Sequence, residues 1–454
     1  MDAKKRVVIT GIGAVSPNGV GREAFAAACL AGKSGIGWID GVDTAGLKSS
    51  VAAQVRGFDP QSVLPAVELR RVPRMVPMAL AASREALQQA GLLSSLNGLI
   101  ASDSKSTVRT ASGVPSELTR RAAGGSHSSF AKNPLDDLDV QRSIAVALGT
   151  GGGGLGFVEQ QYREMFTGGQ ASLYSITGGT HGNLSSELSI ALHLRGPSHV
   201  ISTGCTSSTD ALGYAAMMIR AGVVPMVLAG GADSPIEPGI LSAFEKMRVV
   251  STRRWDEPGQ SSRPFSIDRD GFVLGEGAWM FVLEDADHAA ARGATVLAEI
   301  AGYGSTCDAF HRVQIAPDVV EPVRAMQLAM AEAGVDAGDI DYINLHGTST
   351  ELNDRMETQA VKKCFGERAA RIPMSSTKSM IGHPQGACGA AGIAATVLSM
   401  LAGAVHPTIN LDRADPSCDL DYVPNVARKV RVRTALCNCI AFGSKNSALV
   451  IKNI

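Results

Sequence analysis

The chain has 454 residues, of which 45% are hydrophobic and 19% are charged, and its formal net charge is -1. This composition excludes a disordered chain and predicts a large buried core, arranged as two or three domains or as two fused halves. A nearly neutral chain has no bulk attraction for nucleic acid or for anionic lipid, so an acidic partner would have to meet a local basic patch.

The N-terminus and the cysteines predict a soluble, cytoplasmic protein. Residues 1–13, MDAKKRVVITGIG, contain no apolar signal region, and no later stretch is an uninterrupted apolar span of membrane length. Eight cysteines without repeated C-x-x-C pairs predict neither a disulfide framework nor a zinc site, since Cys437 and Cys439 form only a C-x-C. Most cysteines are therefore expected to be reduced and buried, and no metal is expected.

Apolar runs rich in β-branched residues alternate with amphipathic helical patterns along the chain. The runs that predict strands in the first part are residues 6–10, 143–149 and 223–231. The helical patterns in the same part are residues 77–90 and 211–220. Strands that alternate with helices predict an α/β fold.

The same alternation resumes after residue 297. A helix is predicted at residues 320–333 and a strand at residues 342–345. A polar, small-residue stretch, residues 285–293, separates the two parts. We therefore expect an N-terminal half, residues 1–284, and a C-terminal half, residues 285–454.

Two glycine-rich runs, residues 11–19 and 149–156, each follow a predicted strand and superficially resemble a phosphate-binding turn. The first breaks the G-x-G-x-x-G spacing, and neither has a Walker lysine followed by Ser or Thr. Tight strand-to-helix turns or close backbone packing are the preferred interpretation. Residues 94–138 lack sustained periodicity and are interpreted as a surface insertion, whose basic residues fit a solvated loop better than a binding site.

The segment around Cys205 contains the most informative cysteine. A short predicted strand, residues 198–202, breaks at Gly204 and places Cys205 at the start of an amphipathic helix. The free N–H groups and the macrodipole of a helix N-terminus favour a thiolate, so a lowered thiol pKa is expected, and the same N–H groups can hold an oxyanion. This segment alone leaves open that Cys205 only packs the helix start.

Two later segments place histidines at similar positions. His346 ends a predicted strand in DYINLHGTST, and Lys378 and His383 surround a strand-to-helix turn in SSTKSMIGHPQG. Sites in α/β sheets form at the carboxyl ends of strands, so these side chains and Cys205 are expected to converge on one pocket. A lone histidine is more often a satisfied core residue, but two histidines flanked by glycine and hydroxyl residues favour a catalytic site.

Six segments carry a resemblance that covers nearly the whole chain outside residues 94–138. They are GCTSSTDALGYA, SSRPFSIDRDGFVLGEGA, HGTSTELNDRMET, KSMIGHPQGACGAAG, HPTINL and CDLDYVP. The chain resembles the elongating β-ketoacyl-acyl-carrier-protein synthases. The resemblance implies a thiolase-like fold of two similar α/β halves in a five-layered α-β-α-β-α arrangement. It also implies decarboxylative Claisen condensation of a Cys-bound acyl chain with malonyl-ACP.

The resemblance implies a role for each matching residue. Cys205 matches the nucleophile, and the backbone N–H groups of Cys205 and Phe442 match the oxyanion hole. His346 and His383 match the two histidines that bind the extender's thioester carbonyl and stabilise the enolate left when CO₂ departs. Lys378 matches the lysine that orders this histidine network.

Further residues match the surroundings of the site. Phe442 and Phe272 match a gating phenylalanine and a second aromatic residue near the entrance. The expected supporting residues are Glu357, as ion-pair partner of Lys378, and Thr348, Thr350 and Asp354. The chain departs from the family at residues 438–444, where N-S-F-G-F-G-G is replaced by NCIAFGS, and at Gly392, where a glutamate is frequent. These departures put the motion of the gate and an outer carboxylate in doubt.

The acyl pocket and the docking surface are also inferred from the resemblance. The residues expected at the end of the acyl pocket are Gly152, Ile176 and Gly178, with the alternative that glycine here only permits close packing. The residues expected to dock an acidic acyl carrier protein are Arg70, Arg71, Lys246 and Arg248. No cofactor is expected beyond the phosphopantetheine of the carrier. The partner is expected to be a second copy or a ketosynthase-like chain-length partner.

Three alternatives to this function stay open. A thiolase-like acyltransferase on CoA esters would use a second cysteine, which the pair Cys437 and Cys439 could supply. A non-catalytic chain-length partner normally lacks the nucleophile that Cys205 provides, and a scaffold would use the fold without chemistry. Within the family, STGCTSSTDALGYA and LNDRMET are closer to type II polyketide and polyene ketosynthases than to fatty-acid enzymes.

Overall fold

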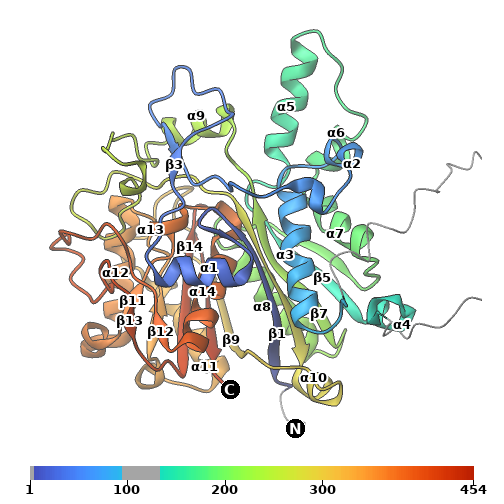
Figure 1. The fold of residues 1–454 in the computed structure, drawn as a ribbon. Helices are drawn as coiled ribbons and strands as arrows, with labels where there is room; N and C mark the ends of the chain where they lie inside the picture. Colours follow the sequence, from blue (N-terminus) through green and yellow to red (C-terminus); the bar gives the residue numbers. More distant parts are fainter. Residues whose placement is uncertain (1–4, 95–132) are drawn as a thin grey trace, which may run out of the picture.

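A computed structural model describes residues 5–94 and 133–454 and contains a mixed eleven-stranded sheet (Figure 1). The strands of its N-terminal part are β1 (Val7–Ser16), β2 (Gly19–Val20), β5 (Ile144–Gly149), β6 (Ser198–Ile201), β7 (Met226–Asp233) and β8 (Gly277–Asp285). Those of its C-terminal part are β9 (Ala298–Cys307), β10 (Tyr342–Asn344), β11 (Met374–Ser375), β14 (Thr434–Ala441) and β15 (Lys445–Lys452). Two small sheets pair β3 (Gly37–Trp38) with β4 (Val51–Ala52) and β12 (Ala404–Val405) with β13 (Arg428–Lys429).

The sheet repeats one topology twice. The N-terminal strands follow the order β6-β5-β7-β8-β1, and the C-terminal strands follow the order β11-β10-β14-β15-β9. Numbered within each part without the short strand β2, which pairs only with β1, both orders read 3-2-4-5-1, with the same parallel and antiparallel pairings. The two first strands, β1 and β9, join the parts through the pairs Val8 with Glu299 and Ile9 with Ala298.

Helices cover the sheet in layers. The outer layer of the N-terminal part contains α3 (Met75–Gln89) and α7 (Leu184–Leu192), and that of the C-terminal part contains α11 (Val320–Ala333) and α12 (Glu351–Phe365). Between the two parts lie α8 (Ser207–Arg220) and α14 (Cys388–Ala402), which contact each other and strands of both parts. The expected five-layered, thiolase-like α/β fold is therefore confirmed.

Alternating strand residues assign each face to a different core. On β7, Val227 and Ala229 pack in the cluster that contains the central helices, whereas Met226 and Leu228 pack with α3 and α7. On β15, Leu449 and Ile451 belong to the central cluster, and Ala448 and Val450 pack beneath α11 and α12. Successive side chains of a strand point to opposite faces, so both faces of these strands need apolar side chains.

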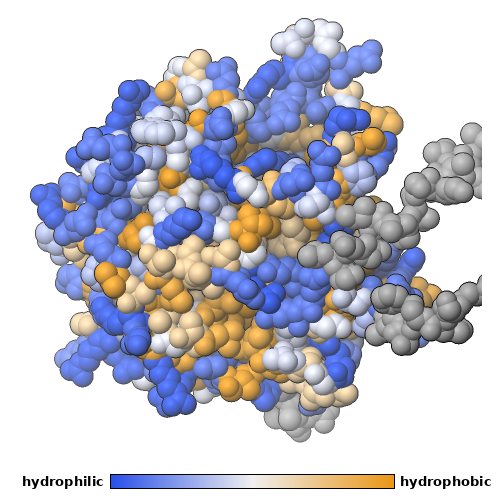
Figure 2. Space-filling view, viewed as in Figure 1, coloured by the Kyte–Doolittle hydropathy of each residue, from blue (hydrophilic) through white to orange (hydrophobic). Residues whose placement is uncertain are grey.

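The remaining helices include α13 (Lys378–Ile381) and α1 (Arg22–Leu30), which contribute to the central core. The others, which are shorter or more peripheral, are α2 (Ala66–Leu69), α4 (Leu138–Ser143), α5 (Leu155–Phe166), α6 (Ser175–Gly179), α9 (Pro238–Lys246) and α10 (Ala286–Ala291). Figure 1 shows α5 projecting beyond the rest of the fold, and Figure 2 shows mainly hydrophilic side chains on the visible side of this arm. Most of the expected surface insertion, residues 95–132, lies outside the described residues.

The two glycine-rich runs have different structures. The strand expected at residues 6–10 continues as β1 through the first run to Ser16, so close backbone packing, the second of the two interpretations, is confirmed there and a turn directly after residue 10 is not. Its Gly11 and Gly13 allow α3 to pack closely, since a Cβ on either would lie within 2.0 Å of a helix carbonyl oxygen. The second run is a strand-to-helix turn, as expected, between β5 and α5.

Among the described residues, Gln385–Ala402 alone combines the length and apolar composition of a membrane-spanning helix. This segment contains α14, and 78% of it is buried inside the molecule. Its position between the two parts of the sheet accounts for its apolar composition, because a helix of the central layer is covered on all sides.

Candidate active site

Cys205 lies between β6 and α8, where the sequence predicted it. The chain reverses direction at Gly204, whose φ of +70° suits glycine. The turn is held by the backbone N–H of Thr203, which donates to the Ser207 hydroxyl, and by that hydroxyl, which donates to the Gly204 carbonyl. The Cys205 side chain is buried at the start of the helix.

The two histidines come from the C-terminal part of the sheet. His346 follows β10, and His383 lies between α13 and α14. The backbone of His383 is fixed by a parallel bridge to Leu274: its N–H donates to the Val273 carbonyl, and its carbonyl accepts from the Gly275 N–H. Backbone contacts therefore set the position of this ring.

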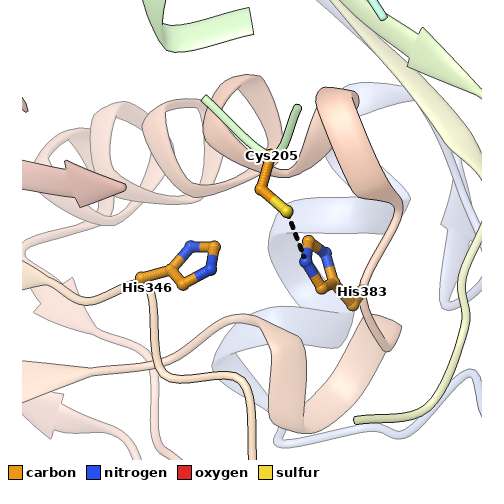
Figure 3. A group of neighbouring side chains, drawn as sticks. All are labelled: Cys205, His346 and His383. Carbon is orange, nitrogen blue, oxygen red and sulfur yellow. Dashed lines mark hydrogen bonds between the residues drawn. The ribbon is translucent and has the colours of Figure 1, made fainter. Parts of the chain in front are cut away.

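The three side chains meet as expected. Figure 3 shows the rings of His346 and His383 and the Cys205 thiol directed toward one another. The Cys205 Sγ lies 3.1 Å from His383 Nε2, and the two imidazole centroids lie 5.4 Å apart at an angle of 86°. A thiol and two imidazoles at these distances can act on one thioester carbonyl.

Burial determines the protonation of the site. It lowers the pKa of His346 to about 3, with a smaller contribution from the Lys378 charge, and it also lowers the pKa of His383. Both rings are therefore neutral near pH 7. The expected lowering of the Cys205 thiol pKa is wrong: complete burial raises it, although Lys378 and the backbone N–H of Phe442 act in the opposite direction.

The tautomers of the two rings are constrained differently. Nδ1 of His383 has no hydrogen-bond partner among residues 5–94 and 133–454, so no contact fixes which nitrogen carries the proton. Its Nε2 can therefore accept from the Cys205 thiol and can donate once the sulfur is acylated. Nδ1 of His346 lies 3.4 Å from the Sγ of Cys439.

Lys378 and Glu357 hold His346 by its backbone. The Lys378 ammonium donates to the His346 carbonyl at 2.6 Å, and the Glu357 carboxylate accepts from the His346 N–H at 2.7 Å. Glu357 also accepts from Gly347 and Asn438. The expected ion pair is therefore wrong, since no ion pair joins Lys378 and Glu357 in the described part of the chain. The two charges act on opposite ends of one residue.

Two further cysteines lie beside the site: the sequence singled out Cys439 only for the thiolase-like alternative and did not single out Cys388. The Sγ atoms of Cys388, at the start of α14, and Cys439, on β14, lie 3.2 and 3.1 Å from the Cys205 carbonyl oxygen and 3.8 Å from each other. Both are buried. Their one sequence signal is that Cys439 occupies the serine position of the N-S-F-G-F-G-G motif.

A cavity of about 400 Å³ leads to the three reactive side chains. Its wall includes Thr348 and Thr350, whose hydroxyls are 2.9 Å apart, and Phe442, the residue expected to act as a gate. Phe272 packs edge-on against the His383 ring, with centroids 5.1 Å apart. Asp354 lies deeper, where its carboxylate accepts from the Thr348 N–H at 3.0 Å and supports the wall.

Comparison with known proteins agrees with this geometry. Residues 4–121 and 126–289 match the β-ketoacyl synthase N-terminal domain, and residues 297–412 match the β-ketoacyl synthase C-terminal domain. The chain belongs to the β-ketoacyl synthase family. Its relatives include 3-oxoacyl-[acyl-carrier-protein] synthase 2 of Coxiella burnetii, which is 36% identical over 99% of both chains.

Other relatives of this β-ketoacyl synthase are named for polyketide synthesis. Actinorhodin polyketide putative beta-ketoacyl synthase 1 of Streptomyces coelicolor is 37% identical over 99% of this chain and 89% of its own. Among solved structures, a chain of AntDE:AntF, a type II PKS acyl-carrier protein in complex with its ketosynthase, matches over all of both chains. That match has a TM-score of 0.83 and 29% sequence identity. The ishigamide ketosynthase/chain length factor matches with a TM-score of 0.82 and 31% identity.

The residues expected at the acyl pocket lie away from the cavity that contains Cys205. The Gly152 N–H donates to Asp233, and a Cβ added there would lie 3.2 Å from the same carboxylate. Ile176 is 76% exposed on α6, and Gly178 is packed against Phe157. These contacts favour close packing at Gly152 within one chain, and a pocket at Ile176 would need a partner chain to close it.

Asp233 is a structural residue that the sequence did not reveal. Its buried carboxylate accepts from the N–H groups of three successive glycines, Gly151 to Gly153, and from Gly386. It thereby ties the glycine-rich turn after β5 to the loop between His383 and α14. The second glycine run thus binds an internal carboxylate.

Proposed function

We propose that this synthase joins a Cys205-bound acyl chain to malonyl-ACP by decarboxylative Claisen condensation, in a type II polyketide or polyene pathway. The contact between Cys205 Sγ and His383 Nε2, with the His346 ring facing both, carries this assignment. The relatedness to named polyketide synthases supports the pathway. We also propose that it acts in the cytoplasm and needs no cofactor beyond the carrier's phosphopantetheine.

In the first half-reaction the thiol proton passes to His383 Nε2 as the sulfur attacks the acyl thioester. The N–H of Phe442, which already points at the sulfur, then faces the developing oxyanion together with the N–H of Cys205. The proton leaves with the departing phosphopantetheine thiol. Because the resting thiol is neutral and buried, the transfer to His383 supplies the activation that the helix N-terminus alone does not.

In the second half-reaction the two histidines donate to the extender's carbonyl oxygen. The Cys388 and Cys439 thiols both lie within hydrogen-bond distance of the Cys205 carbonyl, and we propose that the Cys439 thiol donates to His346 Nδ1. This contact leaves the proton of His346 on Nε2, the nitrogen needed to stabilise the enolate when CO₂ departs. The enolate carbon then attacks the acyl-Cys205 thioester and releases the sulfur.

The same observations disfavour the alternatives. A non-catalytic chain-length partner has no use for a thiol in contact with an imidazole. A thiolase-type reaction needs a second cysteine at the substrate, yet neither Cys437 nor Cys439 lines the cavity. Cys437 instead contacts Thr396 on the central helix.

The reaction is tested by mass spectrometry of the intact chain after incubation with acyl- and malonyl-loaded carrier proteins. We expect an acyl adduct on Cys205 and a carrier-bound product two carbons longer. An adduct on another cysteine, or transfer that requires CoA esters in place of the carrier, would contradict the proposal.

The proposed carrier-docking residues differ in their surroundings. Arg248 lines the mouth of the cavity, and Lys246 ends α9 two residues earlier. Arg70 borders a separate depression beside α5, and the Arg71 guanidinium is already paired with Glu68 at 2.6 Å. We therefore expect Arg248→Glu to weaken carrier binding and its salt dependence more than Arg71→Glu does. Equal losses would reject this ranking.

A partner subunit is proposed from the open edge of the sheet. β6 is the last strand of the N-terminal part, so one side of its backbone has no neighbouring strand in the described chain. Phe166, Leu173 and Ile176, on the arm formed by α5 and α6, are 79%, 90% and 76% exposed. A second copy or a ketosynthase-like chain-length partner would cover these apolar side chains and close the acyl pocket.

A further inference from the structure

Behind the His346 ring, the buried donor atoms that orient its proton also form a cluster of the kind that holds a metal ion. The Sγ atoms of Cys388 and Cys439 and a ring nitrogen of His346 lie within 4.8 Å of one another, and all three residues are buried. The three segments that supply them are 42 to 93 residues apart, which is why cysteine spacing along the sequence predicted no zinc site.

The separations fit a tetrahedral zinc ion. With Zn–S bonds of about 2.3 Å and Zn–N bonds of about 2.0 Å, the edges of a tetrahedron are roughly 3.8 Å between sulfurs and 3.5 Å between sulfur and nitrogen. The observed separations are 3.8 Å between Cys388 Sγ and Cys439 Sγ, and 3.4 Å between Cys439 Sγ and His346 Nδ1. Two of the three separations therefore already match a zinc complex, and the third, between Cys388 Sγ and the His346 nitrogen, lies within 4.8 Å.

The chemistry of the donors selects the metal. Thiolate and imidazole favour zinc over magnesium or calcium, which prefer oxygen ligands. Two thiolates also neutralise a divalent cation, so the buried complex carries no net charge. The Cys205 carbonyl oxygen, 3.2 and 3.1 Å from the two sulfurs, borders the fourth position.

We propose that His346, Cys388 and Cys439 form a binding site for one Zn²⁺ ion, on the opposite side of the His346 ring from its Nε2. Binding displaces the two thiol protons to solvent and involves no oxidation. The ion would hold His346 with its proton on Nε2, as the Cys439 thiol does without metal. Metal binding is a property additional to the condensation, and it can be tested without measuring condensation activity.

The probe is Co²⁺, added to the reduced, untagged, metal-free chain and followed by absorption spectroscopy. We expect one Co²⁺ per chain, with a thiolate-to-cobalt charge-transfer band and the intense visible bands of tetrahedral cobalt, all removed by one equivalent of Zn²⁺. Cys388→Ala and Cys439→Ser should each weaken binding on the order of 100-fold or more, since loss of an outer-shell contact alone costs 10–100-fold.

Two variants serve as controls. Cys437→Ser removes a buried thiol on the same strand as Cys439, where it contacts Thr396 of α14, and Cys205→Ala keeps the backbone carbonyl beside the site. Both should bind Co²⁺ like the parent chain. A parent without the charge-transfer band would overturn the proposal. So would a band that survives in Cys388→Ala but disappears in Cys205→Ala, because the ion would then lie among Cys205, His346 and His383.

Discussion

Ser444 connects the segment that contains Phe442, the proposed gate, to the loop that contains Phe310 and His311. Substitution by alanine or by glycine removes this contact. The Ser444 hydroxyl accepts from the N–H groups of Phe310 and His311, at 3.3 and 3.2 Å, and donates to the His311 carbonyl at 2.8 Å. Ser444 also has a φ of +64°, in the left-handed region where the family motif has glycine. The side chain thus adds hydrogen bonds and also adds backbone strain.

The two contributions have different sizes in Ser444→Ala and Ser444→Gly. Phe310 and His311 are exposed, so water can replace the lost bonds, and each costs about 0.5–1 kcal/mol, the lower part of the usual range. Ser444→Ala therefore lowers the free energy of unfolding by about 2 kcal/mol and keeps the backbone strain. Glycine loses the same bonds but relieves about 1–2 kcal/mol of left-handed strain. We expect the stability order parent, then glycine, then alanine.

Urea unfolding measures this order, and hydrogen exchange measures the motion of the gate. The amides of Asp308 and Gly443, which bond Ser444 and Arg312 across the two loops, should exchange faster in both variants. An alanine variant as stable as the glycine variant would refute the strain argument. Unchanged exchange in both would refute the role of the hydroxyl in holding the gate.

Three further predictions concern the buried site and its surroundings. Cys205→Ala should abolish condensation, because a methyl group cannot form the thioester, while Cys437→Ala keeps most of it; product formation is measured for both. His346→Ala and His383→Ala should each slow CO₂ release on the order of 10²-fold or more by removing one donor to the enolate, and unchanged release in both would reject these roles. Burial lowers the pKa of His406 to about 4, so the unfolded chain binds the extra proton below its usual pKa of about 6.5, and stability falls as pH falls. Lowering the pH from 7.5 to 5 should therefore reduce the free energy of unfolding by about 2 kcal/mol through His406 alone. In His406→Gln the same pH change should reduce the free energy of unfolding by about 2 kcal/mol less than in the parent chain, as measured by urea unfolding.

Local sequence patterns predicted the parts of the site that depend on one segment each. Cys205 before α8 and His346 after β10 were placed by a strand, a glycine and a helical pattern within about 20 residues. These features depend on local backbone geometry, which short patterns encode. The resemblance to β-ketoacyl synthases then assigned their roles.

Properties that depend on the packed environment could not be predicted in this way. The helix N-terminus suggested a lowered pKa for Cys205, but the depth of burial reverses the direction. The resemblance implied an ion pair between Lys378 and Glu357, but each side chain instead bonds the His346 backbone. Cys388 and Cys439 are distant in sequence, and only the fold reveals that their sulfurs meet.

The repeated topology explains why these groups converge. In each half the third strand of the sheet, β6 or β11, leads through a turn toward a helix of the central layer, α8 or α14. Because α8 and α14 pack against each other, the chain segments that precede them meet between the halves. One segment supplies Cys205 and the other supplies Lys378, His383 and Cys388. The contact of Cys388 Sγ with the Cys205 carbonyl therefore joins the starts of two topologically equivalent helices. It follows that a substitution at Cys388 acts on the nucleophile's backbone, although 183 residues separate the two positions in sequence.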